Sequence, residues 1–218
     1  MTGEPEGFHL ASNRTDNIMN TLYTIGHSNH STDHFLKLLH INKISAISDV
    51  RSSPYSKYAP QFNRENIQRD LKDNDIAYVY LGAELGPRSN DPNCYKNGQV
   101  QYDCLSQLDT FKEGLTRIQI GLKNHRIALM CSEKDPILCH RMILICRHLK
   151  SDDLQIYHIL EDGHLEPNRK AERRLMKLLK IPELSLFEKP EELIQSAYDK
   201  QGEKIAYTTE NSNDLELS

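Results

Sequence analysis

Five short runs of hydrophobic residues recur along the chain and predict five β-strands. They cover residues 22–26, 44–50, 76–81, 126–131 and 154–160, and they are rich in β-branched or aromatic residues. Within each run the apolar residues follow one another almost without interruption. This pattern is typical of strands whose two faces are both covered, as in a parallel sheet.

Between these runs, apolar residues recur at intervals of three and four, which predicts helices. The clearest helix covers residues 104–122, where one apolar stripe consists of Leu105, Leu108, Phe111, Leu115, Ile118 and Leu122. Further helices are expected at 32–40 after Ser31, at 64–73 after Asn63, from about 137 to 149, and at 168–179. Ser31 and Asn63 are suitable N-cap residues for the first two.

Strands and helices therefore alternate along the chain as successive βα units. This order favours an α/β fold with a single open, mostly parallel sheet of about five strands and helices on both faces. The order of the strands within the sheet does not follow from the pattern.

The predicted α/β domain covers residues 21–187 of the 218. Residues 1–20 predict a flexible N-terminal tail, and 188–218 predict a C-terminal helix and a flexible tail that includes 201–218. Two long connections, 52–62 and 82–103, lack a periodic pattern. Long loops in a compact domain usually cover a functional site.

Charge and composition exclude some classes of protein. The 27 Lys and Arg against 31 Asp and Glu give a net charge of −4, which argues against a nonspecific nucleic-acid coat but allows a local basic pocket. No apolar stretch approaches the roughly 20 residues that span a bilayer, and the first ten residues do not resemble a signal peptide. We therefore expect a cytoplasmic protein without a membrane partner. The five scattered cysteines predict reduced thiols and not a disulfide framework.

Reactive or charged side chains follow every predicted strand. His27 and Ser28 follow the first, Asp49 and Arg51 close the second, and Glu133 comes just after the fourth, which ends at Cys131. The carboxyl ends of parallel strands meet at one edge of a sheet, where helix N-termini also favour anions. The sequence therefore places the candidate site at this edge.

The segment from Cys131 to Arg141 has the richest chemistry. Cys131 could be a nucleophile, with His140 or His27 as proton carrier and Arg51 with Arg141 as partners of an anion. Cys131 could equally be a small buried residue that ends a strand. The carboxylates of Asp49 and Glu133 could transfer protons, or they could form ion pairs that hold the loops.

A metal site would draw on the same part of the chain. Candidate ligands are Cys131, Cys139, His140, His27, His158 and His164. No familiar zinc-ligand spacing occurs, and on a helix the adjacent Cys139 and His140 would point to different sides. We therefore expect no metal. Gly26 and Gly82 belong to neither a dinucleotide-binding motif nor a P-loop, so no cofactor is expected.

Residues 54–58 combine Tyr55 and Tyr58 with Lys57, which could stack on bases and contact phosphates. Tyrosines beside a proline also pack loops onto their own domain. A basic run from Arg169 to Lys180 could bind a polyanion or could be a solvated helix face. Nucleic acid is therefore a candidate partner alongside a small anion.

Four ordered motifs resemble the uncharacterised DUF488 family: Thr24–Ser28, Asp49–Ser56, Leu81–Gly86, and Cys131–Glu133 with Cys139–Arg141. The resemblance covers about residues 22–179. It implies a shared pocket, and it implies no reaction, because the family has no assigned activity. The matching positions are His27, Ser28, Asp49, Arg51, Pro54, Ser56, Gly82, Gly86, Cys131, Glu133, Cys139, His140 and Arg141. A fainter likeness is to rhodanese-like domains.

The leading hypothesis is an enzyme, a hydrolase or transferase that binds an anionic small molecule or nucleotide at the strand ends. The expected catalytic residues are Cys131, Glu133, His27 and His140. The expected substrate-binding residues are Ser28, Asp49, Arg51, Ser56, Tyr55, Cys139 and Arg141. The alternative is a noncatalytic module that binds a nucleotide or nucleic acid.

Overall fold

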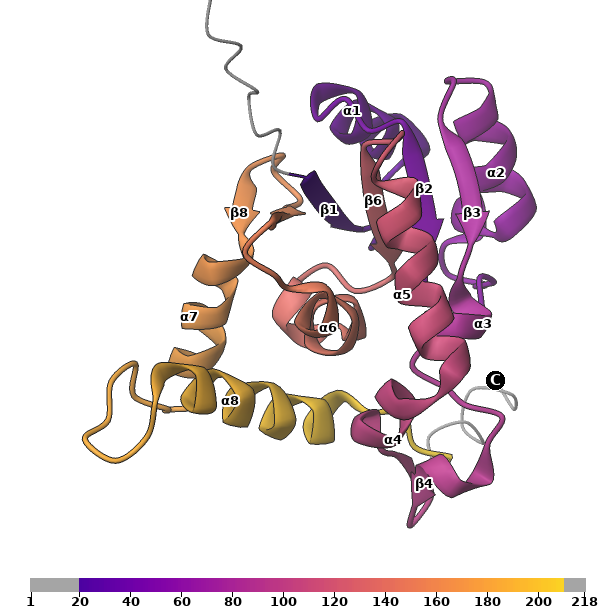
Figure 1. Cartoon of the computed structure of the whole chain (residues 1–218). Helices are drawn as coiled ribbons and strands as arrows, with labels where there is room; N and C mark the ends of the chain where they lie inside the picture. The colour runs from indigo at the N-terminus through magenta and orange to yellow at the C-terminus, as the bar shows by residue number, and fades with distance from the viewer. Residues whose placement is uncertain (1–19, 210–218) are drawn as a thin grey trace, which may run out of the picture.

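Six strands form one open sheet in the order β3-β2-β6-β1-β7-β8 (Figure 1). The computed structural model of the chain describes residues 20–209, so the predicted N-terminal tail, Asn20 excepted, lies outside the described residues. The strands of the sheet are β1 (Asn20–Gly26), β2 (Ala46–Asp49), β3 (Ala77–Tyr80), β6 (Ile127–Cys131), β7 (Leu154–Ile159) and β8 (Leu165–Pro167). A separate hairpin joins β4 (Tyr95–Lys96) and β5 (Gln99–Val100).

The α-helices are α1 (Thr32–Ile41), α2 (Arg64–Lys72), α3 (Gly82–Leu85), α4 (Tyr102–Gln107), α5 (Asp109–Gly121), α6 (Arg147–Leu149), α7 (Asn168–Leu178) and α8 (Pro190–Ile205). Short 3-10 turns are η1 (Pro60–Phe62), η2 (Pro92–Cys94) and η3 (Pro136–Leu138), and η4 (Arg141–Cys146) is a π-helix.

All five strands expected from the sequence are in the sheet, and the pairs among them are parallel. The predicted open, mostly parallel α/β sheet is therefore confirmed. The sixth strand, β8, pairs antiparallel with β7. It was not predicted because it is only three residues long and ends in Pro167.

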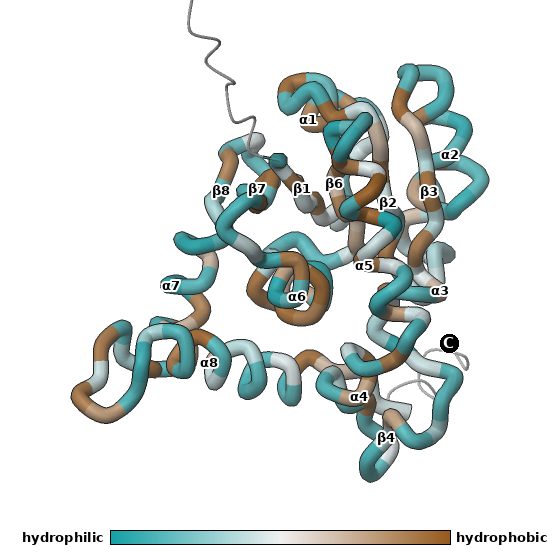
Figure 2. Tube along the Cα trace, viewed as in Figure 1, coloured by the Kyte–Doolittle hydropathy of each residue, from teal (hydrophilic) through white to brown (hydrophobic). Residues whose placement is uncertain are grey.

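The two faces of the sheet are covered by different helices. Leu129 and Cys131 of β6 face a core with α5, α7, α8 and the segment 141–149, whereas Ala128 and Met130 face a core with α1 and α2. Alternate residues of one strand are thus buried on opposite sides, which explains the continuous hydrophobic runs. Figure 2 shows β6 and the segment around α6 as largely hydrophobic, while α2 is mostly hydrophilic.

Local signals explain where some helices begin. Ser31 caps α1, because its side chain accepts a hydrogen bond from the backbone N–H of His34. Asn63 stands at the N-cap position of α2 but makes no capping hydrogen bond. Its Oδ1 instead accepts from the backbone N–H of Ser56 at 2.7 Å, so it fastens the long loop 52–62.

The helix expected at 104–122 is interrupted. Leu108 has an extended backbone and separates α4 from α5. Apolar spacing continues across the break, so periodicity alone does not detect it. Asp109 stands in the first turn of α5, where a carboxylate interacts favourably with the helix dipole.

The helix expected at about 137–149 begins later than predicted. Residues 136–138 form η3, Cys139 is extended with φ −133° and ψ 140°, and a π-helix follows at Arg141–Cys146. Pro136 and the side chain of Asp135, which accepts from the N–H of Ile137, favour the tight turn at this point.

Cys94 and Cys104 form a disulfide, so the expectation that all five cysteines are reduced thiols is wrong for this pair. The β4–β5 hairpin folds the loop 82–103 back and brings their Cα atoms to 5.2 Å, within the usual range. Cys131, Cys139 and Cys146 are free and buried.

Helix α8 extends further than predicted. It runs from the end of α7 towards α4 and continues to Ile205, so residues 201–205 are not part of a loose tail (Figure 1). Gln201 and Gly202 are buried, and Gln201 Nε2 donates to the carbonyl of Ile137 at 2.9 Å. The remainder of the predicted C-terminal tail from residue 210 lies outside the described residues.

Among the described residues, no helix has both the length and the apolar composition to cross a bilayer.

Two glycines at the ends of strands allow backbones to approach closely. A Cβ at Gly26 would overlap the carbonyl oxygen of Glu133, and a Cβ at Gly82 would overlap the carbonyl oxygen of Arg51. Any larger residue at Gly26 must therefore displace the loop that carries Glu133.

We predict that Gly26→Ala lowers the free energy of unfolding by roughly 1–3 kcal/mol, because the added methyl group collides with backbone and not with a movable side chain. Chemical denaturation measures this. The matched control is Gly202→Ala within α8, where the nearest atom to the new Cβ is Tyr102 Cδ2 at 3.2 Å. Helix propensity offsets that contact, so a change below about 1 kcal/mol is expected. Equal effects of the two substitutions would contradict the interpretation.

Candidate functional site

The pairing of β1 with β6 continues beyond the ends of both strands, and the candidate site lies where this pairing ends. The backbone N–H of His27 donates to the carbonyl of Cys131, and that of Ser28 donates to the carbonyl of Ser132, each at 2.9 Å. His140 Nε2 lies 3.0 Å from the carbonyl of Val50. The expectation that the stretches 26–28, 49–52 and 131–141 meet at one edge of the sheet is confirmed.

Four side chains at this edge bring their polar atoms together, and we refer to Cys131, Glu133, Cys139 and His140 as the reactive cluster. One ligand atom from each lies within 4.8 Å of the others. Both thiols donate to Glu133 Oε2 at 2.9 Å. His140 Nδ1 is 3.6 Å from Cys131 Sγ and 3.8 Å from Cys139 Sγ.

The expectation that Cys139 and His140 would point to different sides of a helix is wrong. Cys139 has an extended backbone, and the following helical segment begins only after it. The two neighbouring side chains can therefore point to the same place, which two adjacent residues of a regular helix cannot do.

The reactive cluster is closed on one side and open on the other. Cys131, Cys139 and His140 are buried, whereas Glu133 is exposed to solvent. Burial, together with hydrogen bonding to Cys131, raises the pKa of the Cys139 thiol well above its ordinary value. Burial of its carboxylate end opposes ionisation of Glu133, but His140 and the thiol donors outweigh it and lower its pKa.

A second layer beside the reactive cluster is formed by His27, Arg51 and Asp49. Arg51 makes two hydrogen bonds to the carboxylate of Asp49, at 2.9 and 2.6 Å, and both residues are buried. Arg51 Nη1 lies 3.1 Å from His27 Nε2, and Arg51 Nη2 donates to the carbonyl of Phe62. The guanidinium group is thus engaged within the chain on every side.

His27 is held on both ring nitrogens and on one ring face. Its Nδ1 is 2.9 Å from the carbonyl of Ser28, and its ring stacks on Phe62 with centroids 4.4 Å apart. Burial, and after it the charge of Arg51, lowers the pKa of His27 to about 4. His27 is therefore neutral at neutral pH, with Nδ1 as donor and Nε2 as acceptor from Arg51.

Two tyrosines of β3 complete this layer and were not predicted. The hydroxyl of Tyr78 donates to Asp49 Oδ2 at 2.8 Å, and the hydroxyl of Tyr80 donates to the carbonyl of Ser52 at 3.0 Å. The signal was present in the sequence, because residues two apart in a strand share a face. Burial, and after it Asp49, raises the pKa of Tyr78.

Arg141 links the reactive cluster to the centre of the sheet. It is fully buried and donates to the carbonyls of Glu133 and Lys134. Its Nε donates to Thr24 Oγ1 at 3.2 Å, and Thr24 Oγ1 lies 2.8 Å from His158 Nδ1. Arg141 thereby fastens the loop after β6 to β1.

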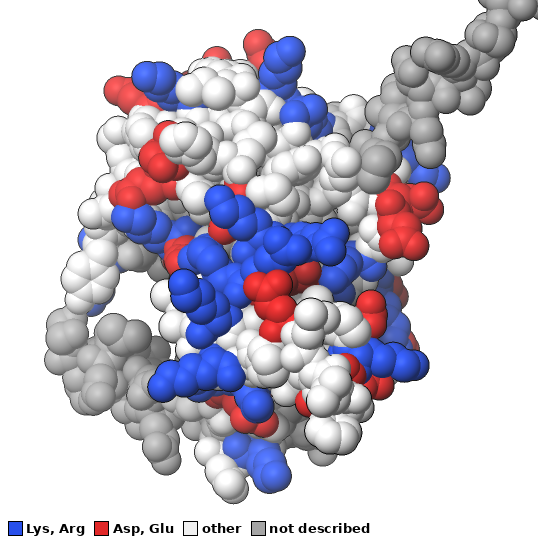
Figure 3. Space-filling model, turned by 90° about the vertical axis from the view of Figure 1, so that its left-hand side faces the viewer, with Lys and Arg blue, Asp and Glu red and all other residues white. Residues whose placement is uncertain are grey.

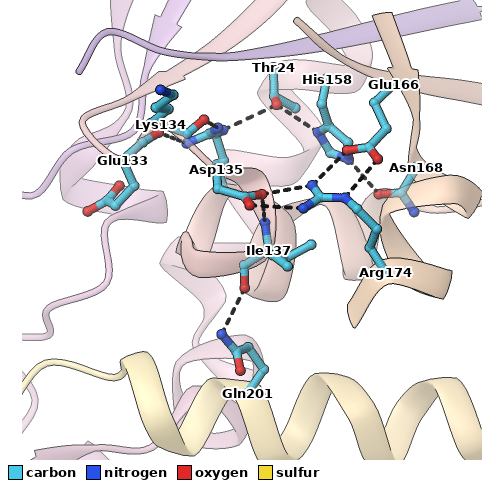
Figure 4. Close-up of polar contacts among 11 residues, drawn as sticks. Thr24, Glu133, Lys134, Asp135, Ile137, His158, Glu166, Asn168, Arg174 and Gln201 are labelled. Carbon is cyan, nitrogen blue, oxygen red and sulfur yellow. Dashed lines mark hydrogen bonds and ion pairs between the residues drawn. The ribbon is translucent and has the colours of Figure 1, made fainter. Parts of the chain in front are cut away.

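A polar network continues from His158 to α7 (Figure 4). His158 Nε2 lies 3.1 Å from Asn168 Oδ1. On the same side, Arg174 forms two hydrogen bonds with Asp135 and two with Glu166, between 2.8 and 2.9 Å. Because Asp135 belongs to the loop after β6, these contacts fasten this loop to α7 and β8. From the sequence, Arg174 was considered only as part of the basic run 169–180, and neither Asp135 nor Glu166 was predicted as a site residue, since the separation of the three residues along the chain forms no pattern.

Other residues singled out from the sequence lie outside the reactive cluster. Ser56 Oγ accepts from the N–H groups of Tyr58 and Ala59, and the hydroxyl of Tyr55 donates to Glu65. His164 is exposed and pairs with Asp162. Ser28 has a positive φ of 46°, a conformation that a residue other than glycine rarely adopts and that clusters at functional sites.

A hollow of about 590 Å³ lies beyond the end of β3. It is lined by residues of the Leu81–Gly86 motif and of the loop 82–103, among them Gly82, Gly86 and Arg88, and by Ser52. Ser52 is two residues from Val50, whose carbonyl contacts His140. The hollow and the reactive cluster are thus connected through the short segment 50–52, of which Ser52 lines the hollow and Val50 contacts His140.

Comparison of the sequence with known families matches residues 31–147, more than half of the 218 residues, to the family described as "Domain of unknown function DUF488". The chain belongs to the DUF488 family. No curated protein and no solved structure matches the chain.

Within this DUF488 protein, the matched residues contain three of the four motifs that carried the resemblance. Asp49–Ser56, Leu81–Gly86 and Cys131–Arg141 lie inside 31–147, while Thr24–Ser28 precedes it. All four residues of the reactive cluster are inside the matched stretch. The family membership thus coincides with the site, and it assigns no reaction to it.

The buried His158 should make the stability of this DUF488 protein pH-dependent. Burial, and after it Arg141, lowers the pKa of His158 from 6.5 to about 3. Between these values an unfolded chain binds a proton that the folded chain excludes. The contribution of the neutral, buried His158 to the free energy of unfolding is therefore complete above pH 6.5. It is lost as the pH falls, by up to about 1.4 kcal/mol per pH unit.

We predict that His158→Gln reduces the slope of unfolding free energy against pH between about 6 and 4, as measured by urea denaturation at several pH values. The control is Ile159→Val, a buried neighbour without a titrating group. It should lower the free energy of unfolding equally at every pH. A slope in His158→Gln as steep as in the wild type would show that the proton is taken up elsewhere.

Proposed function

We propose that this DUF488 protein is an enzyme, a hydrolase or transferase that acts on an anionic substrate at the reactive cluster. The observation that carries the proposal is the position of Glu133. The residue as a whole is exposed to solvent, while its carboxylate turns inward, with Oε2 2.9 Å from the sulfur atoms of both Cys131 and Cys139. A substrate that reaches Glu133 meets a carboxylate, two thiols and an imidazole at one point.

In this proposal Glu133 transfers a proton to or from the substrate. The nucleophile is the thiol of Cys131 at the end of β6, or a water molecule that is bound at the reactive cluster and attacks instead of the thiol. His140 Nδ1, 3.6 Å from Cys131 Sγ, is the base that accepts the thiol proton. Its other ring nitrogen is held by the carbonyl of Val50, which fixes the orientation of the imidazole.

The buried cations have a positioning role in this proposal. Arg51 and Arg141 are engaged by Asp49, by backbone carbonyls and by Thr24, so they hold His27 and the loop after β6 in place. Arg88 lines the neighbouring hollow together with Glu84 and Asp91, and its guanidinium group lies over the ring of Tyr207, 4.3 Å from the centroid. In this proposal its charge attracts an anionic group, such as a phosphate or carboxylate, to this side of the site.

The experiment begins with a thermal-shift screen of nucleotides, phosphate esters and short oligonucleotides, followed by mass spectrometry of each ligand that raises the melting temperature. We predict that Glu133→Gln lowers turnover of such a ligand by about 10²–10⁴-fold, the usual contribution of a general acid or base. The ligand-induced thermal shift should remain, because the change removes a charge and keeps the shape of the side chain.

Ser132→Ala, an exposed neighbour on the same loop, is the matched control and should retain turnover. A ligand that binds but is never converted by the wild type would contradict the proposal and favour a binding module. Unchanged turnover in Glu133→Gln would place the reaction elsewhere.

One observation favours the alternative of a nucleic-acid or nucleotide binding module. Figure 3 shows a band of Lys and Arg across the face on which α7 lies. The exposed basic residues of this helix and the turn after it are Arg169, Lys170, Arg173, Lys177 and Lys180. Such a band attracts polyanions through release of counterions.

If α7 binds nucleic acid, a variant with Arg169, Lys170 and Arg173 changed to Ala should lose affinity for a short oligonucleotide at low salt. The logarithm of affinity against the logarithm of salt concentration should also become less steep, by about 0.7–0.9 for each lost phosphate contact. Fluorescence anisotropy over a salt series measures both. Identical curves for variant and wild type would remove α7 from the interface.

A further inference from the structure

The separations between His140 and the two thiols of the reactive cluster fit a bound metal ion. A tetrahedral ion with a metal–sulfur distance of about 2.3 Å and a metal–nitrogen distance of about 2.0–2.1 Å holds a sulfur and a nitrogen ligand roughly 3.5 Å apart. His140 Nδ1 lies 3.6 Å from Cys131 Sγ and 3.8 Å from Cys139 Sγ. One ion can therefore contact all three atoms with small adjustments.

The ligand atoms are also oriented as ligands need to be. His140 donates its Nε2–H to the carbonyl of Val50 at 3.0 Å, which leaves the lone pair of Nδ1 facing the two sulfurs. Metal-bound histidines characteristically hold their second nitrogen in this way. Cys139 Sγ also accepts the backbone N–H of Arg141, at 3.4 Å.

The electrostatics of the reactive cluster favour a cation at its centre. Two thiols and a carboxylate converge there, and three of the four residues are buried. Two thiolates and one carboxylate carry three negative charges, and a divalent ion with the buried cation Arg141 balances them. A divalent ion also replaces the two thiol protons that now both point to one oxygen, Glu133 Oε2.

We propose that Cys131, Cys139, His140 and Glu133 bind one divalent transition-metal ion, and that this ion is zinc. Thiolate and imidazole ligands in a tetrahedral arrangement select zinc over magnesium or calcium, which prefer oxygen ligands. The ligands come from the end of β6, from the loop after it and from the residues before η4. Gly26 allows the loop after β6 to lie against the end of β1, since a side chain at Gly26 would overlap the carbonyl of Glu133.

Glu133 is the ligand that can be exchanged. Glu133 is exposed as a residue, whereas Cys131, Cys139 and His140 are buried, so water or substrate would approach the ion from the side of Glu133. Catalytic zinc sites keep one such position open beside three protein ligands. This inference deepens the proposed function: the nucleophile becomes a metal-bound water, and the displaced carboxylate accepts its proton.

The test uses the full chain, purified in the presence of a reductant that keeps the thiols free. Elemental analysis should find about one zinc per chain. Removal of zinc by a chelator and addition of Co²⁺ should give the absorption of tetrahedral cobalt with thiolate ligands. A chain that contains no zinc and takes up neither Zn²⁺ nor Co²⁺ from micromolar solution would overturn the proposal.

Variants identify the ligands. Cys131→Ser and Cys139→Ser should each lower zinc content by at least tenfold, and Glu133→Gln should retain zinc through the other three ligands. Cys146→Ser is the matched control, because Cys146 is a buried free cysteine that lies outside the reactive cluster, at the end of η4. This variant should keep the ion. Full zinc content in Cys131→Ser and Cys139→Ser would overturn the assignment.

The cobalt spectrum of the wild-type chain needs no variant, so poor folding of a cysteine variant leaves the test intact. The two proposals can also fail separately. Turnover without any bound metal would overturn the metal site and keep Cys131 as nucleophile. One bound zinc without conversion of any ligand would support the metal site and overturn the proposed reaction.

Discussion

The guanidinium group of Arg141 carries a charge at a place with no access to solvent. Moving such an ion out of water costs several kcal/mol unless every donor finds a partner. The carbonyls of Glu133 and Lys134 and the hydroxyl of Thr24 are those partners. The loop after β6 can therefore adopt little other than the conformation that satisfies this cation, and the reactive cluster inherits its geometry from that requirement.

Other contacts of the site secure the same loop from different sides. The close approach at Gly26 seats it on the end of β1, and Arg174 holds Asp135 from α7. On the neighbouring strand, Asp49 and Arg51 form a buried pair that orients His27. The proposed chemistry at Glu133 would thus take place on a scaffold that buried hydrogen bonds hold from several sides.

The strands were predictable because burial on both faces leaves continuous apolar runs, as in β6. The edge of the sheet that holds the site was predictable for the same reason, since parallel strands carry their ends to one side. The proximity of Cys139 and His140 was not, because it depends on one extended residue between η3 and the π-helix. Neither periodicity nor spacing records the backbone conformation of a single residue, and the same limit hid the break at Leu108.

The segment Arg141–Cys146 is wound with a wider turn than its continuation α6. A π-turn accommodates one more residue than an α-turn between the same two end points, and such segments are rare and frequently occur at functional sites. Removal of one residue from this segment would let it relax to the ordinary pitch, which is favourable for the helix taken by itself. The end points of the segment could then stay where they are, while the side chains between them would rotate relative to their present neighbours. The extra residue of this short segment therefore determines which neighbours its buried side chains face.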